Sequence, residues 1–213
     1  MTSTDVSRTP GQAVPADIAA ERAAIEAEIA GSTLLTVYAE TAAAHGDAEA
    51  HRWKDDAGTW HSLTYRQVRE RVRDLALGLV DGGFGPGEFA AIWSGNRTEA
   101  TVADYAVMHA RGVPVFIYNT ASAEQAAYII GHCQATVAIV ESRYLPRLLE
   151  IRGRLPRLRQ VILIDGEPPA DGVLRYADVL RTGAAGSTGA AGSTGGNEAR
   201  FEEMWRRVAP DDL

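Results

Sequence analysis

The sequence has very little of several features on which common functions depend. A single cysteine, Cys133, excludes a disulfide framework and a metal centre built from several cysteines, and it indicates a reducing compartment. No apolar run approaches the ~18 residues of a membrane span, and residues 1–15 lack the apolar core of a signal peptide. With a net charge of −7, the chain has no general attraction for nucleic acid or anionic membranes. The sequence therefore predicts a cytoplasmic protein without transmembrane segments or nucleic-acid partners.

Lysine is also nearly absent. Of the 21 basic residues that are lysine or arginine, only Lys54 is a lysine. Lysine is the usual compact charge for an ATP phosphate, and its pKa is readily tuned for proton or covalent chemistry. Any mechanism that requires two lysines is therefore incomplete within this chain.

What is present is typical of a globular α/β protein. Hydrophobic residues make up 46% of the 213 residues, which is enough for a full core. Short apolar segments alternate with helical patterns, a sequence typical of a layered fold with a mainly parallel sheet flanked by helices on both faces. The expected strands are 89–93, 113–118, 136–140 and 161–164, and the expected helices between them are 97–110, 122–133 and 143–154.

An N-terminal helical and hairpin segment is expected before this alternation. Its predicted elements are helices at 17–30 and 33–45, a hairpin of 50–54 and 59–63, and a helix from Thr64 to about Val80. Thr64 with Gln67, and Ser122 with Gln125, have the spacing of capping boxes. Asn96 is the expected cap of the helix that begins at Arg97.

The composition predicts four successive regions. Residues 1–15 are expected to be a disordered leader, and residues 16–182 the α/β subdomain. Residues 183–188 and 189–194 repeat the hexapeptide Gly-Ala-Ala-Gly-Ser-Thr, so 183–199 is expected to be a flexible linker. Residues 200–213 are expected to contain a short amphipathic helix.

Two glycine-rich segments are candidates for nucleotide binding. Gly85, Gly87 and Ala90 match G-x-G-x-x-A, but this loop follows a helix and enters a strand, the reverse of the order that a dinucleotide needs. A turn is therefore the favoured interpretation. The Gly-Ser-Thr repeat suggests a phosphate loop, but no lysine follows it, so a linker is favoured.

Six arginines lie within residues 143–159 and are a candidate anion site. They would suit CoA, nucleotide phosphates or the acidic face of a partner. A solvated helix face and loop is the favoured alternative, because arginine replaces lysine throughout the chain. The six are Arg143, Arg147, Arg152, Arg154, Arg157 and Arg159.

Histidine and cysteine give no catalytic or metal-binding pattern. The histidines, at 45, 51, 61, 109 and 132, lack ligand spacing, although His51 and His61 could face each other across the hairpin. His132 and Cys133 are adjacent on a helix and do not face each other, which favours a buried, inert cysteine. No catalytic, cofactor-binding or metal-ligating residue is assigned.

Four strings resemble the N-terminal portion of AMP-forming acyl-CoA synthetases, the adenylate-forming superfamily that includes luciferases. The resemblance covers about residues 33–165 and 201–213, and the Tyr-x-Thr-x-x-x-Glu-Gln form is most similar to the long-chain fatty acyl branch. Asn119 replaces a frequent proline. The strings are Trp60–Val68, Ile92–Glu99, Gly112–Gln125 and Ala135–Val140.

The resemblance implies a two-step reaction in which a carboxylate attacks ATP to give an acyl-adenylate, and the thiol of CoA then displaces AMP. It implies ATP, Mg²⁺ and CoA, a glycine-rich loop with a lysine for the phosphates, and a further lysine in a C-terminal domain. None of these motifs is found here, and residues 205–213 are similar to the segment just ahead of the phosphate loop. The expectation is the scaffold portion of a long-chain fatty acid–CoA ligase, without bound cofactors of its own and catalytically silent alone.

A second hypothesis is a non-catalytic module that pairs with another ligase chain, because a parallel sheet cut at this place leaves an unpaired edge. The partners would be the remaining subdomains of a ligase or a second copy through that edge. A third hypothesis, a Rossmann-like nucleotide-binding domain, needs a strand followed by a glycine loop, and that order is not found.

Overall fold

The computed structural model describes residues 16–55, 57–169, 171–186 and 194–212. The chain forms two units, residues 1–32 and 33–213. The described part of the first unit, residues 16–32, contains helix α1 (Ala16–Glu28), whose Ile18 and Ile25 side chains are exposed. The predicted leader, residues 1–15, lies outside the described residues. No helix within the described ranges combines the length and the apolar character needed to cross a bilayer.

The second unit begins with the predicted helical and hairpin segment. Its elements are α2 (Leu34–Ala44), the antiparallel hairpin β1 (Glu49–Lys54) and β2 (Trp60–Thr64), and the long helix α3 (Tyr65–Asp81). The Thr64–Gln67 capping box forms as predicted, because the Thr64 hydroxyl accepts from the Gln67 N–H while the Gln67 side chain accepts from the Thr64 N–H. A locally encoded signal thus fixes the start of α3.

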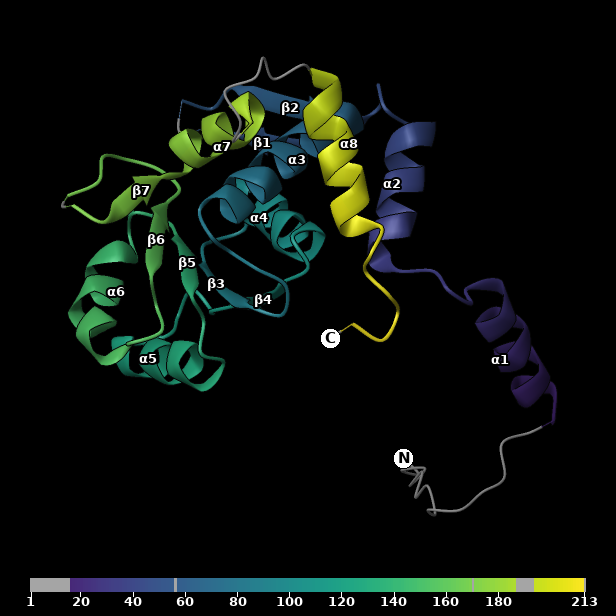
Figure 1. The fold of residues 1–213 in the computed structure, drawn as a ribbon, viewed down its shortest axis with the longest axis horizontal. Coiled ribbons are helices and arrows are strands. Elements are labelled where there is room, and N and C mark those ends of the chain that lie inside the picture. The colour runs from purple at the N-terminus through teal and green to yellow at the C-terminus, as the bar shows by residue number, and fades with distance from the viewer. Residues whose placement is uncertain (1–15, 56, 170, 187–193, 213) are drawn as a thin grey trace, which may run out of the picture. The chain divides into compact units, whose positions relative to one another are not determined.

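A five-stranded, fully parallel sheet follows, which confirms the predicted α/β class (Figure 1). The sheet has the order β4-β3-β5-β6-β7. Its strands are β3 (Phe89–Trp93), β4 (Val113–Phe116), β5 (Val137–Val140), β6 (Gln160–Leu163) and β7 (Val173–Arg175). The connecting helices are α4 (Thr98–His109), α5 (Ala123–His132), α6 (Leu145–Ile151) with a 3₁₀ turn (Arg152–Arg154), and, after β7, α7 (Tyr176–Ala185) and α8 (Thr194–Trp205).

Helices cover both faces of this sheet. Ala90 and Ile92 of β3 point into a core shared with α3, α4, α7 and α8, whereas Ala91 and Trp93 point into a second core shared with α5 and α6. Successive side chains of a strand face opposite sides, so a strand buried on both faces must be apolar throughout. This explains why the strands are continuous apolar runs in the sequence.

Two glycines let α3 and α7 pack closely. A Cβ on Gly183 would overlap the carbonyl oxygen of Asp74, and one on Gly78 would overlap that of Val179. Neither position tolerates a side chain without a shift of a helix. The contact places α7 beside α3 over one face of the sheet.

Three sequence expectations differ from the structure. The predicted linker, 183–199, is helical at both ends, because α7 extends to Ala185 and α8 begins at Thr194. Asn197 is buried there, and its side-chain amide donates to the carbonyls of Gly183 (3.1 Å) and Ala184 (2.8 Å) at the end of α7. Residues 187–193, the centre of the predicted linker, lie outside the described residues.

The other two differences are local. The cap position of α4 is occupied by Arg97, not Asn96, and no side chain bonds to the helix start there. Strand β7 and helix α7 were not predicted as elements, because a three-residue strand is too short to show an alternating pattern.

Candidate functional site

The site that the fold favours lies where the strand order reverses. From β3 the chain crosses to β4 on one side, and it then crosses back to β5 on the other side of β3. In open parallel sheets, ligands bind outside the carboxyl ends of the strands at such a reversal, because the two neighbouring loops diverge there. The loops here are residues 94–97 after β3 and residues 141–143 after β5.

A cleft of about 440 Å³ is present at this place. Both loops line it, together with Asp165, two residues after β6, and the end of the β1 strand. Its lining is mixed in charge, with four carboxylates against three cations. The charged residues are Asp55, Glu99, Glu141 and Asp165, and Lys54, Arg97 and Arg143.

Glu141 holds the two loops together. Its Oε2 accepts from the peptide N–H of Gly95 at 2.8 Å and lies 3.3 Å from the Ser94 hydroxyl, which donates to it. Its Oε1 lies 2.7 Å from Nε of Arg143. A carboxylate of the chain itself therefore takes the peptide donor that an incoming anion would use.

Arg97 is paired twice. Its Nε and Nη2 donate to Glu99 at 2.8 and 3.1 Å, and its Nη1 lies 3.1 Å from Asp165. Asp165 also accepts from the Ser142 N–H at 2.8 Å. Burial raises the pKa of Glu99 and of Asp165, but the hydrogen bonds to these carboxylates outweigh it and hold both pKa values below their usual range. Both acids are thus ionised partners of Arg97 at neutral pH.

The cleft residues do not fit the ATP and Mg²⁺ that the resemblance implies. The Gly95 N–H, Arg97 and Arg143 already bind carboxylates of the chain, so a polyphosphate would have to displace them at a cost. Within the described ranges, no three histidine, cysteine or acidic residues are grouped as metal ligands. Lys54 reaches the cleft from the hairpin, where its Nζ lies 5.8 Å from the centre of the Trp60 ring. We derive no chemical step through ATP at this cleft.

The G-x-G-x-x-A segment is a turn, as predicted. Gly87 has a φ of +74°, and its N–H donates to the Arg111 carbonyl at 2.8 Å. The Glu88 carboxylate accepts from the Gly85 N–H and pairs with Arg159. These contacts direct the chain into β3 and present no free amides to a phosphate.

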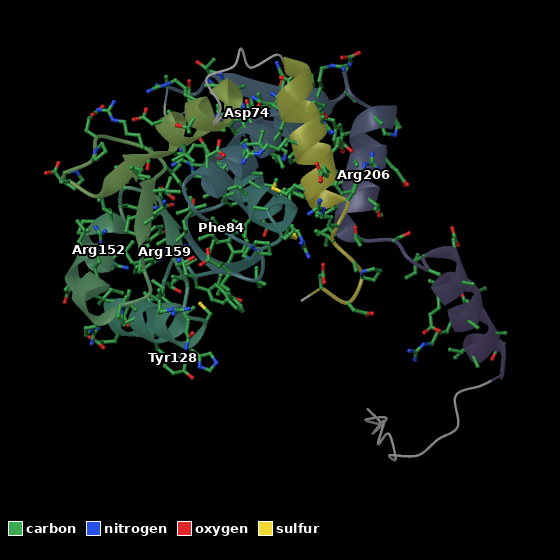
Figure 2. All side chains as sticks on the ribbon, in the orientation of Figure 1. Asp74, Phe84, Tyr128, Arg152, Arg159 and Arg206 are labelled. Carbon is green, nitrogen blue, oxygen red and sulfur yellow. The ribbon has the colours of Figure 1, made fainter. Side chains whose placement is uncertain are left out.

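The arginine series is largely engaged by the chain itself, which supports its favoured interpretation as a solvated face. Three of the six pair with acids, and three donate to backbone carbonyls, Arg159 doing both through its bond to the Gly83 carbonyl. The contacts are Arg147 with the Ala121 carbonyl, Arg152 with the Gly172 carbonyl, Arg143 with Glu141, Arg154 with Glu124, and Arg159 with Glu88 (Figure 2 labels Arg152 and Arg159).

The histidines of the hairpin do not face each other. His51 is paired with Leu63, and His61 is paired with Trp53, on which it stacks. The Nε2 of His61 lies 2.8 Å from a carboxylate oxygen of Asp55. This arrangement is a surface contact and not a pair of metal ligands.

His109 and Cys133 are structural groups. His109 is 1% exposed, its Nδ1 lies 2.6 Å from the Tyr105 carbonyl, and its ring stacks on Phe201 at 4.9 Å. Burial lowers the pKa of His109 to about 4, so the ring is neutral at pH 7. Burial also raises the pKa of the partly buried Cys133 thiol, which makes it a poor nucleophile.

Sequence reasoning did not identify the Glu141–Arg97–Asp165 cluster. The sequence does contain a pattern that could have revealed it, because each member closely follows one of the apolar strands β3, β5 or β6. The carboxyl ends of parallel strands lie at one edge of the sheet, so polar residues at these positions are brought together.

Residues 38–203 match the family described as AMP-binding enzyme. The chain belongs to this family. Among curated AMP-binding enzymes and their relatives, the chain is 33% identical over 113 residues to the long-chain-fatty-acid–CoA ligase FadD15 of Mycobacterium bovis, covering 53% of this chain and 19% of the ligase. It is 31% identical over 131 residues to the long-chain-fatty-acid–CoA ligase ACSBG2 of Xenopus laevis, which covers 61% of this chain and 18% of ACSBG2. The chain thus spans about a fifth of these ligases.

A third relative is short. The uncharacterized protein Rv1549 of Mycobacterium tuberculosis is 29% identical over 139 residues, which cover 65% of this chain and 76% of that protein. Among solved structures, the fold is similar to the anthranilate CoA ligase AuaEII in complex with anthranoyl-AMP, with a TM-score of 0.65 and 24% identity over 71% of this chain and 28% of that chain. It is also similar to the long-chain-fatty-acid–CoA ligase FadD1 of Archaeoglobus fulgidus, with a TM-score of 0.60 and 19% identity. That match covers 70% of this chain and 29% of FadD1.

Proposed function

We propose that this chain is the scaffold portion of an AMP-forming long-chain fatty acid–CoA ligase. The reaction of the whole enzyme would be fatty acid, ATP and CoA to acyl-CoA, AMP and pyrophosphate. The observation that carries the proposal is the match to two long-chain ligases, FadD15 and ACSBG2, together with the membership of the AMP-binding family. The shared fold of the CoA ligases is consistent with it.

In this proposal the chain positions the catalytic groups of the rest of the enzyme and supplies none of its own. The pairs of Arg97 with Glu99 and Asp165, and of Glu141 with the Gly95 N–H, fix the loops at the carboxyl end of the sheet. A fixed frame holds neighbouring catalytic groups in position without reorganisation during the reaction. The phosphate-binding lysine, the Mg²⁺ ligands and the acyl and CoA sites would lie on other parts of the enzyme, and the compartment would be the cytoplasm.

A second candidate function is a non-catalytic module that complements a separate ligase chain. The observation that favours it is the similarity to Rv1549, because the aligned region makes up 76% of that protein. A short chain with this fold would then act only after binding the remainder of an adenylate-forming enzyme.

The test is ATP–pyrophosphate exchange with palmitate and Mg²⁺. The chain is assayed alone and mixed with FadD15 of Mycobacterium bovis from which the N-terminal part, through the end of the aligned segment, has been removed. We expect exchange at background for each component and above background for the mixture. The same FadD15 part mixed with its own N-terminal part is the positive control. Exchange by the chain alone would overturn the scaffold proposal.

A further inference from the structure

A second cavity lies at the other end of the sheet from the cleft. Its volume is about 260 Å³, and it is lined by the end of α3, the segments shortly before β3 and β4, and one side of α8 with the turn that follows. The cleft residues follow the strands instead, so the two cavities are at opposite ends of the sheet. We call the second cavity the Arg111 pocket, and its lining includes Val80, Phe84, Met204, Arg111, Arg200 and Arg207.

The inner wall of the Arg111 pocket is apolar. Phe84 is 2% exposed, and Val80 and Met204 are partly buried against the same core. The Phe84 ring (labelled in Figure 2) is fixed, because the backbone of Gly112 runs directly over it, and a Cβ at Gly112 would lie 2.4 Å from two ring carbons. A wall of this kind stabilises a compact apolar group by removing its surface from water.

The rim of the pocket carries three guanidiniums and one carboxylate. Arg200 pairs with Asp81 at 2.6 Å, and Arg207 pairs with the rim carboxylate, Glu203. Each pair uses the Nη2 nitrogen of its arginine. Because a guanidinium carries five N–H groups, further donors remain on both side chains. The rim therefore attracts a negative charge.

Arg111, the third arginine, has no close acidic partner within the described ranges. Its single ion pair there is with Asp212, at 3.9 Å, and the Asp212 side chain is about half exposed. The Nε atom of Arg111 is buried and has no hydrogen-bond partner among the described residues. A buried N–H without an acceptor is costly, and a ligand that supplies the acceptor removes this cost.

The backbone of Arg111 is strained at the same place. Its φ is +61°, in the left-handed region that favours glycine. The Arg111 N–H donates to the Met108 carbonyl and the Gly112 N–H to the Val107 carbonyl, both at 2.9 Å, a helix ending that usually has glycine at the left-handed position. Glycine would end α4 equally well, so the helix gives no reason for an arginine. The reason lies in the side chain, which lines the pocket.

This combination favours a monocarboxylate with a compact apolar body. The Nε and Nη groups of an arginine form a planar fork that matches the two oxygens of a carboxylate. Because only Arg111 on the rim is without a close acid in the described part of the chain, it balances one negative charge. A doubly charged phosphate would leave a charge without a partner. The apolar wall accommodates the rest of the molecule.

We propose that the Arg111 pocket binds a small amphipathic monocarboxylate. The carboxylate accepts from Nε of Arg111, and the apolar body lies against Phe84 and Met204. The pocket is separate from the cleft at the carboxyl end of the sheet. The proposal also stands apart from the proposed function, because a chain that is inactive in pyrophosphate exchange can still bind a carboxylate here.

The experiment is a titration of the 213-residue chain with hexanoate, measured by calorimetry and by ¹⁵N NMR. We expect saturable one-to-one binding at millimolar hexanoate and a shift of the Arg111 Nε–H resonance. Hexan-1-ol lacks the charge and acetate lacks the apolar body. Each is expected to bind about tenfold more weakly or less.

Arg111→Gly is the decisive variant, because it removes the guanidinium and places the best-fitting residue at the left-handed position. It is expected to keep the fold and to weaken hexanoate binding about tenfold or more. Gln134→Gly is the matched control. Gln134 ends α5 in the same way, with a φ of +55°, but does not line the pocket. This control is expected to change binding less than about twofold.

Other results would overturn the proposal. Absence of hexanoate binding, or equal binding of hexan-1-ol, would show that the pocket does not recognise a carboxylate, and equal binding of acetate would show that the apolar wall plays no part. Unchanged binding in Arg111→Gly, or resonance shifts confined to the loops of the cleft, would place hexanoate elsewhere. Circular dichroism checks that the variants fold. The comparison of probes needs only the wild-type chain, so it decides the question even if a variant does not fold.

Discussion

Helix α8 and strand β4 bring aromatic side chains to the same sheet, with opposite results. On α8, Phe201 is completely buried and Trp205 is 3% exposed, whereas Phe116 and Tyr118 at β4 are largely in solvent. Helix α8 packs against α3 and α4, which are distant from it in the sequence (Figure 1). The chain therefore covers one face of its sheet by itself, whereas the aromatic side chains at the β4 edge stay exposed.

Charge explains part of this difference. Arg69 pairs with Glu198 at 2.6 Å and with Glu202, and Arg200 pairs with Asp81 at 2.6 Å, so α8 is held to α3 at several points. No comparable acid or base lies on residues 113–119. Apolar contact together with partly buried ion pairs specifies one docked position, whereas apolar exposure alone specifies none.

The largest expected effect is the loss of Phe201. Phe201→Ala removes a completely buried ring from the contact with His109 and is expected to lower the free energy of unfolding by about 3–5 kcal/mol in urea denaturation. Phe116→Ala, the matched change at the open edge, is expected to cost less than about 1 kcal/mol. Equal losses would remove the distinction between the two regions.

Acid should loosen the α8 region through His109. The folded pKa is about 4 against an ordinary 6.5, because burial, and to a lesser degree Arg69, disfavour the charged ring more than the Tyr105 carbonyl favours it. Its contribution is therefore complete above pH 6.5 and is lost as the pH falls to 4, by about 3 kcal/mol. Urea unfolding of the wild type and of His109→Phe between pH 7 and 4 measures this difference in slope. Parallel pH profiles would show that His109 does not contribute.

Close packing of α7 on α3 gives the next effect. Gly183→Ala places a Cβ against the Asp74 carbonyl and is expected to cost about 1–3 kcal/mol, measured by thermal unfolding. Gly153→Ala is the control, because no atom lies within 4 Å of its new Cβ. A neutral Gly183→Ala would contradict the close contact.

The smallest effect concerns the exposed pair of Arg154, in the turn after α6, and Glu124 on α5. Both side chains are more than half exposed, so Arg154→Ala is expected to cost less than about 0.5 kcal/mol and to be insensitive to salt above 0.5 M. Arg73, which is 14% exposed and pairs with Asp74 and Glu198, is the contrasting site, and Arg73→Ala should cost more in the same urea titration. A larger loss at Arg154 would reverse the comparison.

The sequence predicts the features that are encoded locally. The apolar strands and the capping boxes at Thr64 and Ser122 require only neighbouring residues, so the α/β class follows from the sequence. The contact of Glu141 with Gly95 joins residues 46 positions apart and depends on the strand order, which the sequence does not reveal. The role of Asn197 could not be predicted for the same reason. Its side chain reaches the carbonyls at the end of α7 only because α8 folds back against that helix.

The most direct test of the central claim is equilibrium binding of ATP to the chain alone. Equilibrium dialysis with Mg²⁺ and ATP, with the shortened FadD15 absent, is expected to give no saturable binding at millimolar ATP, because the Gly95 amide, Arg97 and Arg143 are held by the chain's own carboxylates. Saturable one-to-one binding that Arg97→Met or Lys54→Met abolishes would show that the chain holds a nucleotide site of its own and would contradict its assignment as a scaffold.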